Sequence, residues 1–401
     1  MSTLGGVPLT APHPAGGGSA LAVELSSPPR TSEVHVLGDW EVELRSGSTH
    51  AVARTARSFR GAALVDEAID IVHRALDLAS ITTADHLVTL APADNHIAVE
   101  TAAEGVTLRL QSLSDLGIAM GVEITQVHAD GTVERTPPPP ALQWVPAFRF
   151  FRLSQGSRDL FDAFRNLFLG LEALLDQLFP KRAKEGEKQW IKRSLGEAAT
   201  RSHFSSVLLG SGSAPLEDLV DRIYDVRVHL FHAKTGRVLI PDERVSYLRV
   251  AETYPALLGI WSELLRGWMP TGRGSGVVTY GGFRHLIEAS YVGATVALGR
   301  QPAGADPGKG TGGGAPVQWN VLECPAEIRE LRPGRMAVIG RGAAQILRPV
   351  QPFNRLAVVS AGKQPLIAGT LPDLVLDGID QVEVVAAIRL LNLGQPRTEF
   401  S

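Results

Sequence analysis

The chain has 401 residues, more than the roughly 100–200 of a typical single domain, so two or three domains are expected. Hydrophobic residues make up 44% and charged residues 20%, a composition that excludes a wholly disordered protein. The single cysteine, Cys324, excludes an internal disulfide and a zinc or iron–sulfur site built from cysteines. The net charge of −3 excludes a uniformly basic nucleic-acid-binding surface.

The first 30 residues are rich in Gly, Pro, Ser and Ala, which predicts a disordered tail over 1–30. They contain one basic residue, Arg30, and no continuous apolar segment, so they do not resemble a secretory signal. The chain also has no apolar run near the roughly 18 residues of a membrane span. These features predict a cytoplasmic protein without a membrane partner.

Residues 31–136 are predicted to form an acidic α+β domain, because residues 1–148 carry 8 Lys and Arg against 17 Asp and Glu. Residues 62–79 repeat apolar side chains every three or four positions, which predicts a helix. Four consecutive prolines then begin a stiff linker over 137–148. Strand-like patterns are found at 34–37, 40–44, 86–91, 96–101, 106–112 and 118–127.

Residues 149–270 are predicted to form an antiparallel helical bundle, because apolar stripes with helical spacing are joined by short connections. The expected helices are 157–179, 190–203, 216–232 and 242–267.

Residues 271–316 form a mixed segment with a glycine-rich linker, and residues 317–401 are predicted to form a small β-rich domain. Its expected strands are 317–322, 336–339, 344–347, 355–360, 365–368 and 381–386. The sequence therefore predicts a multidomain α+β protein with an N-terminal α+β domain, a central helical bundle and a small C-terminal β domain.

A motif whose residues could carry out a reaction lies in the predicted helix 216–232, where Arg227 precedes His232 by five positions. Arginine offers a permanent positive charge and a forked set of donors that suits phosphate, and histidine exchanges protons near neutral pH. Together they suit metal-independent RNA cleavage, in which the 2′-hydroxyl of the RNA attacks the neighbouring phosphorus. No metal and no cofactor are expected.

This motif resembles the Arg-x-x-x-x-His signature of the HEPN family, particularly its abortive-infection-type branch. Tyr224 and the upstream helix around 164–175 support the resemblance. It implies a HEPN-like RNA-binding protein acting as an endoribonuclease in defence or stress, with Arg227 as phosphate clamp and His232 as acid and base. Many nuclease members have Asn, Asp or His where this chain has Val228, and the nearest polar candidate is His229. The overall layout is also similar to methylamine-utilisation MauJ-like proteins.

The phase of a straight helix separates the side chains of Arg227 and His232 by about 140°, too far to grip one phosphate within a continuous helix. A homodimer through the helical bundle would supply the two groups from different copies, and the resemblance implies such a shared cleft. The alternatives are that the helix ends near Ala233, or that the two residues do not act together.

Arg227 has a second interpretation, in which it braces the bundle by pairing with Glu172 while His232 caps its own helix. The protein is then a non-catalytic HEPN-like scaffold for dimerisation or ligand sensing. A third alternative is an accessory protein of amine metabolism, which the MauJ-like layout suggests. A basic cluster is either a solvated helix face or an RNA contact, and its members are Lys181, Arg182, Lys184 and Lys188.

Overall fold

The computed structural model describes the chain at 1–9, 18–83, 86–118, 125–135, 142–202, 204, 215–232, 238–241, 243–269, 278–301, 317–322, 326–362, 364–392 and 396–400. The four prolines at 137–140, Cys324 and the glycine-rich segment within 302–316 lie outside these residues.

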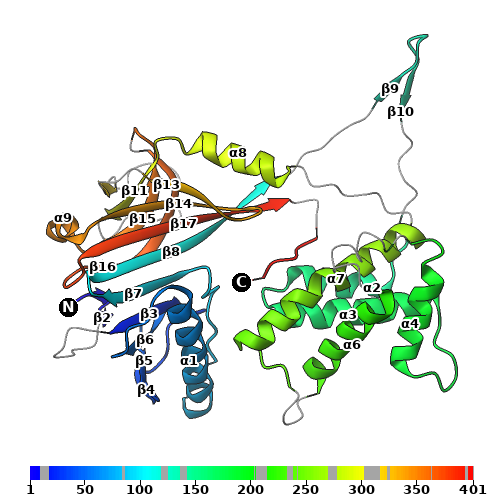
Figure 1. Cartoon of the computed structure of the whole chain (residues 1–401), viewed down its shortest axis with the longest axis horizontal. Helices are drawn as coiled ribbons and strands as arrows, with labels where there is room; N and C mark the ends of the chain where they lie inside the picture. Colours follow the sequence, from blue (N-terminus) through cyan, green and yellow to red (C-terminus); the bar gives the residue numbers. More distant parts are fainter. Residues whose placement is uncertain are drawn as a thin grey trace. The chain divides into compact units, whose positions relative to one another are not determined.

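The described chain contains both helices and strands (Figure 1). The helices are α1 Gly61–Thr82, α2 Pro146–Gly156, α3 Leu160–Leu178, α4 Glu187–Ala198, α6 Leu216–Phe231, α7 Arg244–Trp268, α8 Tyr280–Ser290, α9 Ala344–Leu347 and the 3-10 turn η1 Arg348–Val350. The strands are β1 Thr3–Leu4, β2 Val7–Pro8, β3 Ser19–Glu24, β4 Glu33–Leu37, β5 Trp40–Leu44, β6 His50–Thr55, β7 His96–Ala102, β8 Gly105–Ile118, β9 Thr125–Val127, β10 Val133–Arg135, β11 Thr295–Arg300, β12 Gln318–Val321, β13 Glu327–Arg332, β14 Arg335–Ala343, β15 Phe353–Val359, β16 Pro365–Val375 and β17 Gln381–Asn392.

The chain divides into two compact units. The sheet unit comprises Met1–Ile118 and Val278–Leu391, and the helical unit comprises Ala119–Val277 and Asn392–Ser401. Residues 1–118 and residues 278–391 thus share one unit, although they were expected to belong to separate domains.

The predicted fold class is therefore wrong, because the protein is a mixed α/β structure dominated by two large antiparallel sheets and is not built around a helical bundle. A nine-stranded sheet has the order β13-β14-β17-β8-β7-β3-β6-β5-β4, and a six-stranded sheet has the order β12-β11-β15-β16-β1-β2. In each sheet a strand from the C-terminal third neighbours one from the first 118 residues. Ion pairs reinforce this junction, since Arg109 Nε lies 2.6 Å from Glu383 and Arg389 Nε lies 2.7 Å from Asp115.

The main core of the sheet unit lies between the two sheets and contains apolar side chains from both, among them Val99, Val338 and Val358. Alternation along the strands produces this face, as in β7, where Ile97 and Val99 belong to this core while Ala98 between them is buried on the other face. Gly340 allows close approach at one point, because a Cβ there would lie 2.7 Å from the Val296 side chain of β11.

Helix α1 covers the other face of the strands β3, β5, β6 and β7. Its buried positions recur with helical spacing, as expected from the sequence: Leu64, Ala68, Ile71, Val72, Ala75, Leu76 and Ala79. The predicted disordered tail over 1–30 is a second error, since β1, β2 and β3 fall inside it. The Gly, Pro, Ser and Ala content of residues 1–30 is typical of tails, but Leu4, Val7, Ala20 and Ala22 of these strands pack within the core.

The helical unit contains α2, α3, α4, α6 and α7 around one apolar core, with α3 near its centre (Figure 1). The Asp159 side chain caps α3 by accepting a hydrogen bond from the Asp162 amide at 2.7 Å. Helices are found close to all four predicted segments of this unit, while α2 replaces part of the expected linker.

Some local predictions fail in the sheet unit. Residues 344–347 form the short helix α9 and not a strand, and residues 86–91 contribute only an isolated bridge at Thr89. Strand β8 runs without a break to Ile118. None of the described helices has the length and apolar character that a membrane crossing requires. The cytoplasmic location remains a prediction.

Candidate functional site

Helix α6 carries the motif residues, and its apolar stripe fixes their orientation. The buried side chains recur with helical spacing along one face: Leu219, Val220, Ile223, Val226 and Leu230. This stripe packs into the core of the helical unit. Arg227 and Tyr224, one turn apart, therefore lie at the edge of the buried face and point towards α3 and α4.

Arg227 is held by two glutamates from neighbouring helices. Its Nη2 atom donates a hydrogen bond to Glu187 Oε1 of α4 at 2.8 Å, and it lies 3.7 Å from Glu172 Oε1 of α3. The guanidinium also faces three aromatic rings, with centroid distances of 5.6 Å to Phe168, 5.6 Å to Tyr224 and 5.1 Å to Phe231. These contacts join α3, α4 and α6 through one cation.

The pKa values of Glu172 and Glu187 are shifted in opposite directions. Burial and the neighbouring Glu187 raise the pKa of Glu172 from 4.5 to about 8, although Arg227 opposes the rise. A hydrogen bond with Glu172 lowers the pKa of Glu187 below its usual value, and Arg227 and Tyr224 lower it further. Neighbouring like charges do not both ionise at low cost, so the pair favours a proton on Glu172 and a negative charge on Glu187, beside Arg227.

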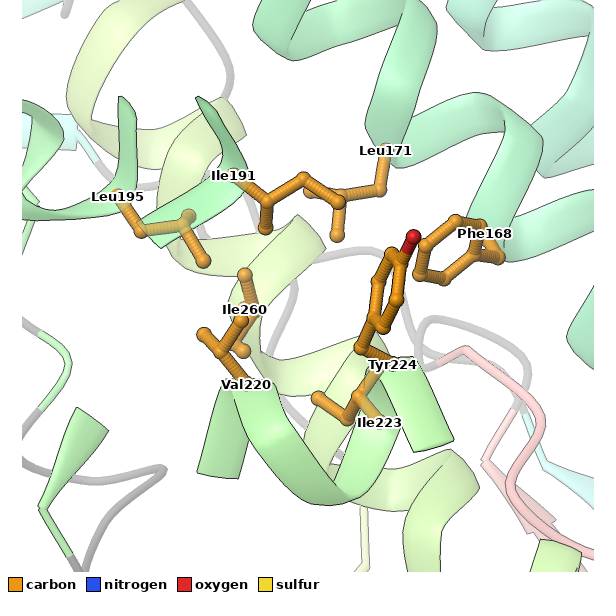
Figure 2. Close-up of a pocket in the computed structure, with 8 residues that line it drawn as sticks. All are labelled: Phe168, Leu171, Ile191, Leu195, Val220, Ile223, Tyr224 and Ile260. Carbon is orange, nitrogen blue, oxygen red and sulfur yellow. The ribbon is translucent and has the colours of Figure 1, made fainter. Parts of the chain in front are cut away.

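Tyr224 links this network to an apolar pocket. Its hydroxyl donates a hydrogen bond to Glu187 Oε2 at 3.1 Å, and its ring lines the pocket beside Phe168 (Figure 2). The other lining residues, all aliphatic, are Leu171, Ile191, Leu195, Val220, Ile223 and Ile260. The Tyr224 hydroxyl is thus the only polar side-chain group among these lining residues.

His232 does not join Arg227 in this network. Helix α6 ends at Phe231, and His232 is the exposed C-cap with an extended backbone at φ −127° and ψ 97°. His229, named as a supporting residue, places its Nδ1 atom 2.7 Å from the Asp225 carbonyl oxygen and 3.5 Å from the Asp225 carboxylate. Neither histidine is among the contacts of Arg227.

The candidate RNA-contacting residues are partly neutralised by acidic neighbours. Lys188 Nζ lies 2.7 Å from Asp221, and Arg182 Nη2 lies 3.3 Å from Glu197. Lys184 and Lys181 are both exposed. The charge of Lys181 also favours the ionised forms of Glu172 and Glu187. The cluster therefore has less net positive charge than its sequence suggests.

The sequence named Arg227 and His232 as catalytic residues, with His229, Glu172 and Tyr224 in support. Of these, the structure brings Glu172 and Tyr224 to Arg227. Two contacts of Arg227 were missed: Glu187, which is its nearest anion, and the ring of Phe231. Glu187 is separated from Arg227 by 40 residues and looked like an ordinary acidic residue at the start of a helix. Only the packing of α4 against α6 reveals its role.

Chemically, the site is an arginine that is hydrogen-bonded to Glu187 and close to Glu172, with aromatic walls, while its buried Nε atom has no hydrogen-bond partner among the described residues. Such a group can hold helices together and can take up or release a proton near neutral pH. Among the described residues there is no cluster of three or more His, Cys, Asp or Glu side chains placed to hold a metal ion.

No protein-family model matches the chain, and no curated protein or solved structure gives a significant match. The resemblance to the HEPN family and the similarity to MauJ-like proteins therefore remain predictions from the sequence.

Proposed function

We propose that the protein is a non-catalytic, HEPN-like scaffold in which Arg227 is a structural brace. The observation that carries this proposal is the engagement of the Arg227 guanidinium by Glu187 at 2.8 Å and by Glu172 at 3.7 Å. A phosphate clamp needs unshared donors that face solvent, whereas this cation is already balanced.

The raised pKa of Glu172 beside Glu187 supports a sensing role within this scaffold. Gain or loss of a proton by Glu172 changes the charge between α3 and α4. A binding event that changes the burial of Glu172 would therefore change the packing of these helices. The pocket beside Tyr224 adds an apolar surface to the same network.

RNA cleavage is the second candidate, because one observation favours it. Helix α6 ends before His232, so the angle of about 140° that a continuous helix would impose between His232 and Arg227 does not apply. An exposed histidine of this kind can act as a general acid or base in a site completed by a second copy.

The experiment that separates the two candidates combines RNA cleavage with thermal melting. Purified wild-type protein, His232→Ala and Arg227→Lys are incubated with mixed RNA in EDTA, and products are examined for 2′,3′-cyclic phosphate ends. The scaffold predicts no cleavage by any of the three proteins, an unchanged melting temperature for His232→Ala and a lower one for Arg227→Lys. Cleavage by the wild type that falls about 10²–10⁴-fold in a folded His232→Ala protein would overturn the scaffold.

A further inference from the structure

The last described segment of the chain, residues 396–400, docks on the helical unit without forming a helix or a strand. Phe400 is only 6% exposed and belongs to the core of that unit. Its ring meets the ring of Tyr254 edge-to-face, with centroids 5.0 Å apart and an interplanar angle of 87°. The Arg397 guanidinium covers the Phe400 ring at 4.7 Å. An aromatic side chain from a short segment therefore completes the helical core.

Side chains of α2 and α7 also bind the main chain of this segment. The Gln155 Oε1 atom accepts a hydrogen bond from the Arg397 amide, and the Tyr247 hydroxyl donates one to the Phe400 carbonyl at 2.9 Å. These two bonds lie at the two ends of the four-residue segment from Arg397 to Phe400. Main-chain recognition with one aromatic anchor is how many proteins bind extended peptides.

The receiving side is held in place by buried hydrogen bonds. The Tyr254 hydroxyl lies 2.8 Å from Ser154 Oγ and 3.0 Å from Gln155 Nε2. Because its amide nitrogen binds Tyr254, the Gln155 oxygen is directed to the Arg397 amide. Ser157 supplies a further acceptor, its carbonyl oxygen 3.0 Å from Arg397 Nη1. Such an arrangement recognises an arginine that is followed three residues later by a phenylalanine.

We propose that this surface of α2 and α7 is a peptide-binding site for extended segments of the Arg-x-x-Phe type, occupied in this chain by its own residues 397–400. The tethered segment has a high effective concentration, so it competes with any external peptide. A partner protein that presents the same pattern would displace it. The site contains neither Arg227 nor His232, so the inference stands whichever function those residues serve.

The test uses a fluorescein-labelled synthetic peptide with the sequence of residues 395–401 and measures fluorescence anisotropy. The full-length Phe400→Ala chain should bind this peptide at least about 10-fold more tightly than the wild type, because its own segment has lost the anchor. The same peptide with alanine in place of its phenylalanine should not bind. Adding Tyr247→Phe to Phe400→Ala should weaken binding about 5-fold, because one hydrogen bond to the main chain is lost.

Circular dichroism and thermal melting establish that each variant is folded. If Phe400→Ala unfolds the helical unit, Arg397→Ala replaces it, since this change keeps the phenylalanine in the core and weakens only the docking. A folded Phe400→Ala chain that binds the peptide no better than the wild type overturns the proposal. So does equal binding of the peptide that lacks phenylalanine, or a wild-type dimer that dissociates on Phe400→Ala, which would make a second copy the occupant.

Discussion

Removal of Arg227 is the most informative perturbation of the helical unit. The Arg227→Ala change leaves the Glu187 carboxylate beside Glu172 without a compensating cation, and it removes the guanidinium from the rings of Phe168, Tyr224 and Phe231. The side chains of Arg227, Glu172 and Glu187 are 16%, 19% and 28% exposed. Breaking a buried ion pair costs about 3–5 kcal/mol, and this partial exposure places the expected loss at the lower end, about 3 kcal/mol.

The assay is urea unfolding of wild type, Arg227→Ala, Glu187→Gln and the double variant, followed by circular dichroism at pH 8. The double variant should lose less than the sum of the single changes, with a coupling of roughly 1–2 kcal/mol, because neither charge is then left alone. In thermal melting, a loss of about 3 kcal/mol corresponds to a fall of roughly 10 °C.

The matched control is Arg249→Ala. Arg249 of α7 pairs with Asp225 of α6, so it also joins two helices, but both side chains are more than 40% exposed. Its removal should cost less than about 1 kcal/mol. If Arg227→Ala unfolds at the same urea concentration as Arg249→Ala, or if the two single changes add, the brace is refuted.

Three further results are expected. Because the pKa of Glu172 is raised to about 8, the folded protein keeps a proton that the unfolded chain releases near 4.5. The free energy of unfolding should therefore fall from about pH 5 to pH 8, by at most ~1.4 kcal/mol per pH unit. Urea titrations at each pH should show that Glu172→Gln abolishes this slope. Tyr254→Phe should cost about 1–3 kcal/mol in urea unfolding, because it leaves the buried Ser154 hydroxyl without its partner; a cost below 0.5 kcal/mol (roughly that of a surface change) would contradict this. Gly340→Ala should lower the melting temperature because its Cβ would lie 2.7 Å from a side chain of the facing sheet, whereas Gly196→Ala on α4, with open space around it, should raise stability by about 0.5–1 kcal/mol; equal effects would rule out this reasoning.

The local pattern of the sequence was enough to find most elements. The apolar repeat of 62–79 predicted α1, and that of 216–232 predicted α6 with its buried face. The alternation at 40–44 predicted β5, since one face of that strand is buried. These elements carry their signal in side chains a few positions apart, which is the range over which periodicity can be read.

The sequence also identified part of the candidate site. The pairing of Arg227 with Glu172 was one of two interpretations of the motif, and the structure places these residues 3.7 Å apart. Glu187 was missed, since an acidic residue in the first turn of a helix is common for reasons of the helix dipole alone.

Only the tertiary structure decided the architecture of the sheets and the place of the chain's last segment. The contact of Arg109 with Glu383 joins residues 274 positions apart, and no local pattern specifies which distant strand pairs with β8 or β16. Likewise, Phe400 shows no periodicity, yet it is buried against Tyr254. Strand pairing and docking depend on complementary surfaces that come together only when the chain folds, whereas helical and strand periodicity is present in each segment by itself.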